Sequence, residues 1–94
     1  MDHRPSVELL ESTHHFPGAY RIKAIGVASG DFEGRVVEAV VAEVAGPSEL
    51  EYSVRTTPNG RYVALTLDIT VQTAEQVRDI YARIRELEGL TLLF

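Results

Sequence analysis

The 94-residue sequence contains no cysteine and no tryptophan, and only one of its nine basic residues, Lys23, is a lysine. The absence of cysteine excludes disulfides, thiolate metal sites and thiol nucleophiles. No stretch reaches the roughly eighteen consecutive apolar residues that a membrane-spanning helix needs, and residues 1–5 lead into no signal-peptide core. These absences predict a cytoplasmic protein without a membrane partner.

Positive charge is also scarce, since the formal net charge is −5. A negative chain repels phosphate backbones, and nucleic-acid-binding proteins usually carry a basic face. An RNA-binding sheet needs several stacking aromatic residues, whereas the segment 60–65 has only Tyr62. We therefore expect no nucleic-acid partner.

What is present is the composition of one globular domain, with 45% hydrophobic and 24% charged residues. Apolar and polar residues alternate with period two in three segments, which predicts half-buried strands. These strands, with a short fourth one at the end, are expected at Ala19–Val27, Leu50–Thr56, Arg61–Val71 and Leu90–Phe94. A turn at Thr57-Pro58-Asn59-Gly60 joins the second strand to the third.

Two helices are expected between the strands. The first should run from Phe32 to Ala45, because apolar residues recur every four positions and Gly46-Pro47 forms a stop signal. The second follows a capping-box match between Thr73 and Gln76 and ends at Gly89.

The resulting β-α-β-β-α-β order predicts an α+β fold, the ferredoxin-like plait. Two right-handed β-α-β units give a four-stranded antiparallel sheet in the order 4-1-3-2, with both helices on one face. We assign residues 18–94 to this single domain. Residues 1–17 are expected to form a mobile N-terminal segment with one helical turn around Glu8–Glu11.

Short motifs along most of the chain resemble those of the YbeD-like domains, a bacterial family of unknown function. They are Glu8-Leu9-Leu10-Glu11, Lys23 with Gly26, Val36 to Val41, Gly60-Arg61-Tyr62, Glu75-Gln76-Val77 and Ile80-Tyr81. The resemblance implies the plait fold, a bacterial cytoplasmic setting and a shape similar to ACT regulatory domains. Domains of the ACT type bind small effectors, commonly amino acids.

The first strand-to-helix loop has the parts of an effector site: Gly26, Ser29, Gly30 and Asp31. Amides at the start of a helix favour an anionic group, Gly30 allows close approach to the backbone, and Asp31 suits an ammonium group. The alternative is a capped turn, in which the Asp31 carboxylate satisfies the helix amides itself.

The face of the sheet that the helices leave uncovered, here called the open face, is a second candidate. Lys23, Arg55 and Tyr62 are expected to lie there and to contact a protein partner. The alternative is that Lys23 pairs across the strands with Asp68 and that Tyr62 covers a neighbouring side chain.

Catalytic, metal and cofactor sites are not predicted. The histidines His3, His14 and His15 have no further ligand at a suitable spacing, and no nucleophile-base-acid set is apparent. The uncharged last strand predicts a homodimer that buries Leu92, Leu93 and Phe94 at a sheet edge. Alternatively, Phe94 folds under the second helix of its own chain.

The sequence thus predicts a noncatalytic regulatory domain that binds a small effector, such as an amino acid, at an ACT-like loop. The alternative is a protein-protein interaction adaptor that presents the open face.

Overall fold

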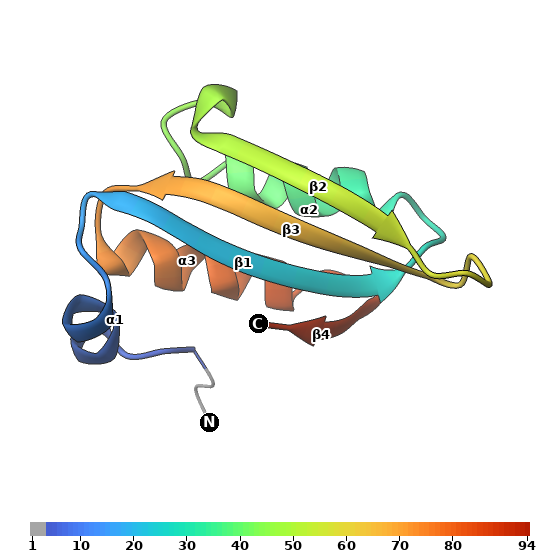
Figure 1. Cartoon of the computed structure of the whole chain (residues 1–94), viewed down its shortest axis with the longest axis horizontal. Coiled ribbons are helices and arrows are strands. Elements are labelled where there is room, and N and C mark those ends of the chain that lie inside the picture. Colours follow the sequence, from blue (N-terminus) through green and yellow to red (C-terminus); the bar gives the residue numbers. More distant parts are fainter. Residues whose placement is uncertain (1–3) are drawn as a thin grey trace.

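The computed structural model describes residues 4–94, apart from the side chain of Pro47, and consists of a four-stranded antiparallel sheet with two long helices on one face (Figure 1). The elements in chain order are α1 (Val7–Thr13), β1 (Gly18–Val27), α2 (Phe32–Val41), the 3-10 helix η1 (Pro47–Glu49), β2 (Leu50–Thr56), β3 (Tyr62–Val71), α3 (Ala74–Arg85) and β4 (Leu90–Leu93). The strands lie in the order β2-β3-β1-β4, which is 4-1-3-2 when read from the β4 edge. The predicted α+β class is confirmed.

β1 and β3 form the centre of the sheet and pair antiparallel over ten residues each. Their side chains alternate between the helix-covered face and the open face, as the period-two patterns predict. In β3 every second side chain is buried: Val63, Leu65, Leu67, Ile69 and Val71. This alternation fixes which polar side chains reach the open face.

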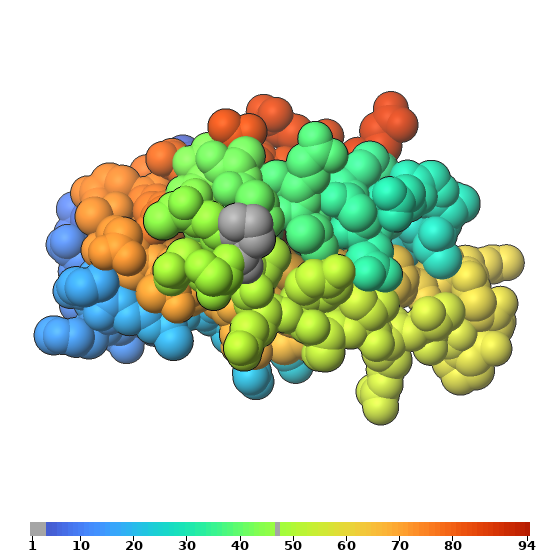
Figure 2. Space-filling model, turned by 90° about the horizontal axis from the view of Figure 1, so that it is seen from above, coloured from blue at the N-terminus to red at the C-terminus, as the bar shows by residue number. Residues whose placement is uncertain are grey.

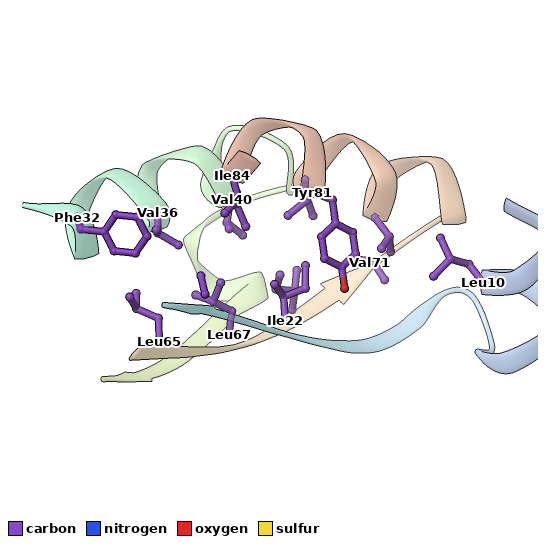
Figure 3. Close-up of a cluster of buried hydrophobic side chains, with 14 of the residues drawn as sticks. Leu10, Ile22, Phe32, Val36, Val40, Leu65, Leu67, Val71, Tyr81 and Ile84 are labelled. Atoms are coloured by element: carbon purple, nitrogen blue, oxygen red, sulfur yellow. The ribbon is translucent and has the colours of Figure 1, made fainter. Parts of the chain in front are cut away.

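The hydrophobic core fills the space between the sheet and the two long helices (Figure 3). Phe32 lies at one end of the core, and Tyr81 points its hydroxyl toward the sheet. That hydroxyl lies 3.1 Å from the hydroxyl of Tyr20. Burial, followed by this hydrogen bond, raises the pKa of Tyr81. The core therefore contains a polar contact that ties α3 to β1.

α2 ends at Val41, four residues before the predicted end at Ala45. The Glu43 N–H donates to the Val40 carbonyl at 3.0 Å, which tightens the chain after the helix. The Glu43 carbonyl then accepts the side-chain N–H of Gln76 from α3 at 2.7 Å. The early end of α2 is therefore accompanied by a contact with α3. Such a contact between distant residues cannot be predicted from the sequence around residue 43.

The two glycines predicted to end helices differ. Gly46 has no positive φ, so its predicted role as the residue that closes the first helix is wrong. Gly89 has a φ of 89° and turns the chain into β4. The Gly89 carbonyl accepts the N–H of Val27 at 2.9 Å, which joins this turn to the end of β1.

The start of α3 confirms the predicted capping interaction. The Thr73 hydroxyl accepts the N–H of Gln76 at 3.1 Å. The Gln76 side-chain oxygen reaches back and accepts the N–H of Gln72 at 2.7 Å. Both ends of this side chain are thus engaged, because its NH₂ group donates to the Glu43 carbonyl.

α1 is a two-turn helix that packs beside α3 (Figure 1). It begins where the Ser6 side chain accepts the N–H of Leu9, and its Leu10 side chain is only 2% exposed. The helix is longer than the single turn predicted around residues 8–11. The mobility of residues 1–17 stays a prediction, and His3 lies outside the described residues.

Candidate functional site

A groove of about 420 Å³ lies on the open face of the sheet. Three strands and the last residue of the chain line it: Lys23, Ile25, Ser53, Val54, Arg55, Ala64, Leu65, Thr66 and Phe94. The lining combines cations, hydroxyls and apolar side chains and contains no acidic residue. Such a surface suits a ligand that is both acidic and apolar.

The register of the strands sets the side chains of the groove in rows. Across β2, β3 and β1, one row runs Ser53, Thr66, Lys23 and the next runs Arg55, Ala64, Ile25. β1 and β2 are not neighbours, yet the rows place a cation from each of them, Lys23 and Arg55, in one groove. Lys23 and Arg55 therefore both line the groove, two strands apart.

Phe94 closes one side of the groove. Its N–H donates to the carbonyl of Lys23 at 2.8 Å, and its carbonyl accepts the N–H of Lys23 at 3.2 Å. The side chain stays 61% exposed. The expectation that Phe94 folds under the second helix is therefore wrong, because β1 holds its backbone at the edge of the sheet.

The two groove cations have no acidic partner among residues 4–94. The expected pair between Lys23 and Asp68 is wrong, since the register places Asp68 opposite Arg21. Arg21 donates to both carboxylate oxygens of Asp68, at 2.8 and 3.2 Å. This hydrogen bond lowers the pKa of Asp68 and raises the pKa of Arg21.

Tyr62 lies outside the groove, although it is on the same face. It pairs with Val27 at the hairpin end of β3, four residues along the strand from Thr66. It is two residues, about 7 Å, from Ala64, which lines the groove opposite Arg55. The structure thus places Lys23 and Arg55 in the groove lining and Tyr62 just outside it.

The strand-to-helix loop forms the capped turn that was the alternative to an effector site. Asp31 lies in the left-handed region, with a φ of 53°, and its carboxylate accepts the N–H of Gly34 at 3.2 Å. Gly26 is buried, and a Cβ on it would lie 2.5 Å from the ring of Phe32. Gly26 therefore makes room for a core side chain.

Arg35 lies beside this loop and holds its backbone. Its guanidinium donates to the carbonyls of Gly30 and Glu88, at 2.9 Å each, and lies 5.8 Å from the centre of the Phe32 ring. A shallow hollow of about 260 Å³ beside it is lined by Val27, Ser29, Gly30, Arg35, Glu88 and Gly89. Two of the four predicted effector residues, Ser29 and Gly30, line this hollow; Gly26 and Asp31 do not.

A sequence profile of the family described as "Protein of unknown function (DUF493)" matches residues 11–93. The chain belongs to this family. UPF0250 proteins from Shewanella sediminis and Shewanella piezotolerans are each 36% identical to it over 83 residues, which cover 88% of this chain and 88% of theirs. The UPF0250 protein of Shewanella halifaxensis is 31% identical over the same length. These relatives are bacterial, and the resemblance to YbeD-like domains of unknown function is confirmed.

The fold has a counterpart among solved structures. The solution structure of protein HP0495 from H. pylori superposes with a TM-score of 0.63, covering 87% of this chain and 86% of that chain, at 10% sequence identity. A likeness at this identity shows the fold alone. Within residues 4–94, none of the helices has the length and apolar character needed to cross a membrane.

The family description names no activity. In the described part of the chain, no group of three or more His, Asp or Glu side chains is placed to hold a metal ion. Sequence reasoning missed Phe94 as a groove residue and Arg35 as the cation of the loop. The signal for Phe94 was an aromatic residue at the end of the predicted last strand, and Arg35 gave none beyond its place in the first helical turn.

Proposed function

We propose that this DUF493 chain is a noncatalytic protein-interaction domain, whose open-face groove binds an acidic and partly apolar segment of another protein. The observation that carries the proposal is the groove lining, where Lys23 and Arg55 have no acidic partner among residues 4–94 and Phe94 offers an exposed ring. The occupant is therefore a carboxylate next to an apolar side chain.

Charge supports this choice of partner. The chain as a whole carries a formal charge of −5, yet the groove lining contains two cationic side chains and no Asp or Glu. An acidic segment would be repelled by most of the surface and attracted at the groove, which favours binding in one place. Ile25 and Ala64, between the cations, supply an apolar floor.

The loop supports an effector site less well. Asp31 is already engaged with a helix amide, and Arg35 with two carbonyls. A ligand at this position would have to replace these bonds before gaining its own. Effector binding at Ser29 and Gly30 stays a prediction.

A peptide-display selection tests the proposal and requires no named partner. A random peptide library is selected on the immobilised protein, and the enriched peptides are measured against three proteins: wild type, Lys23→Glu and Arg61→Glu. Arg61 is a matched control, because it is an exposed cation of the β2-β3 turn that lies outside the groove.

We expect enriched peptides in which Asp or Glu stands beside an aliphatic or aromatic residue. Their affinity should fall at least about tenfold for Lys23→Glu and stay unchanged for Arg61→Glu. Peptides without acidic residues, or equal binding to both variants, would refute the groove. If an enriched peptide is titrated into the labelled protein, NMR amide shifts confined to residues 26–34 would place its binding site at the loop and not in the groove.

A further inference from the structure

The outer edge of β2 has no strand beside it in residues 4–94, because β2 pairs with β3 alone. Figure 2 looks onto this edge, where the yellow-green strand lies at the surface beside α2. We propose that a second copy of the chain pairs here, β2 against β2 in antiparallel orientation about Ser53, to form a continuous eight-stranded sheet. The dimer would use Arg55, one of the two groove cations, and would leave Lys23 available to a groove ligand.

The backbone of β2 sets which residues offer hydrogen bonds outward. The Thr57 N–H donates to the Tyr62 carbonyl, so these two residues form a hydrogen-bonded pair. Such pairs recur at every second residue of an antiparallel ladder. The backbone N–H and C=O groups of the odd-numbered residues of β2 therefore bond to β3. Those of the even-numbered residues are directed outward at the edge.

Only some registers let two such edges pair. A residue whose backbone groups are directed outward must lie opposite another such residue. Pairing about Ser53 satisfies this condition, because it places Tyr52 opposite Val54 of the second copy. Because Ser53 is the middle residue of Leu50–Thr56, the strand then pairs over its whole length. An aromatic residue opposite a β-branched one is a favourable cross-strand pair.

Charge selects the same register. Pairing about Ser53 places Glu51 opposite Arg55 of the second copy, twice in the dimer. These are positions without mutual hydrogen bonds, where the Cα atoms approach to about 4.5 Å and side chains lie closest. Neither residue has an ion-pair partner among the described residues of its own chain. A shift of two residues either way sets one of these charges opposite Ser53.

Exposed apolar side chains mark the same edge on the helix-covered face. Tyr52 is 43% and Val54 39% exposed, although they point toward the side that the helices cover. The Tyr52 hydroxyl donates to Glu33 of α2 at 3.3 Å, which holds the ring beside the helix. Pairing covers both side chains.

The opposite edge is less suited to pairing. β4 has only four residues, and its register with β1 shifts between Ile25 and Gly26. It carries no charge to fix a register, so the homodimer predicted through the last strand is reassigned to β2. The dimer leaves the Lys23 side of the groove open, since Lys23 lies two strands, roughly 10 Å, inside the new interface. Arg55 would pair with Glu51 of the second copy, so in the dimer Lys23 is the groove cation left to a ligand.

Charge exchange tests the register. Sedimentation over a wide concentration range should show a dimer for the wild type, and a dissociation constant raised at least about tenfold for Glu51→Arg and for Arg55→Glu. The double variant Glu51→Arg with Arg55→Glu should dimerise as the wild type does. Circular dichroism of each variant verifies that it folds, and Arg61→Glu is the control for a change of charge alone.

The absence of cysteine allows a second, independent test. In the proposed dimer the two Ser53 residues face each other at a Cα separation within the range of disulfides. Ser53→Cys should form a covalent dimer under mild oxidation, whereas Thr91→Cys on the β4 edge should not. A wild type that stays monomeric, a charge exchange that fails to restore the dimer, or cross-linking through Thr91→Cys alone would each overturn the proposal.

Discussion

The strand-to-helix loop and the open-face groove both combine charged and small residues, but they use their polar groups differently. In the loop, the Asp31 carboxylate binds a helix amide and Arg35 binds two carbonyls. In the groove, Lys23 and Arg55 have no acidic partner in the described chain. The loop looks like a ligand site in sequence because capping a helix and binding an anion need the same groups.

The difference teaches where to look for function in a small domain. Polar groups that are satisfied within the chain stabilise it and must be released before they bind anything else. Solvated cations on a preformed sheet are available without rearrangement. Substitutions in the loop should therefore lower stability, and substitutions in the groove should leave stability unchanged while altering binding.

Gly26→Ala is expected to have the largest effect. The new Cβ would lie 2.5 Å from the buried ring of Phe32, so the core must shift. We expect the free energy of unfolding in urea to fall by about 2 kcal/mol. Gly46→Ala is the matched control, because its Cβ meets nothing within 4 Å and no positive φ opposes it. Equal losses for both variants would contradict a packing role for Gly26.

Asp31→Ala should come next, with a loss of about 1–2 kcal/mol. The variant loses the bond to the Gly34 N–H and places a residue with a Cβ at a φ of 53° without a side chain that favours it. Asp31→Asn retains the acceptor and tolerates this conformation, so it should stay close to the wild type in the same urea experiment. A large loss for Asp31→Asn would show that the negative charge, and not the cap, matters.

Lys23→Ala should change the free energy of unfolding by less than about 0.5 kcal/mol, because the side chain is exposed and has no ion pair within residues 4–94. The loop cation offers the contrast. Arg35→Ala removes two hydrogen bonds to carbonyls and should cost about 1 kcal/mol. Similar losses in the two alanine variants would remove the distinction between the loop and the groove.

Period-two patterns predicted the faces of β1 and β3 correctly, because a buried face leaves a strict alternation in the sequence. The Thr73 cap was equally readable, since its partner lies three residues away. The end of α2 was not: the chain that follows it bonds to Gln76, which is distant in the sequence. Local signals therefore located the elements better than their ends.

The candidate site depended on register, which the sequence pattern leaves open. The alternation put Lys23, Arg21 and Asp68 on one face, but only the pairing of β1 with β3 shows that Asp68 faces Arg21. The position of Phe94 depends likewise on the irregular register between β1 and β4. Faces could be predicted, and neighbours across the strands could not.

The smallest expected effect concerns that ion pair. The hydrogen bond from Arg21 lowers the pKa of Asp68, and the positive charge acts in the same direction. A carboxyl whose pKa is lower in the folded chain contributes stability above its unfolded pKa, near 3.9, and this is lost as the pH falls through the folded pKa. Both side chains are exposed, so the contribution should be small and should weaken with salt.

Carboxyl NMR titration of Arg21→Ala should show the pKa of Asp68 rising toward its ordinary value, and the matching part of the acid dependence of stability should disappear. Lys23→Ala is the control, because the sequence alone suggested Lys23 as the partner of Asp68, whereas the register places Lys23 opposite Thr66. It should leave the titration of Asp68 unchanged. If Lys23→Ala shifted that pKa as much as Arg21→Ala does, Lys23 would be engaged with Asp68, and the groove would lose the unpaired cation on which its binding role depends.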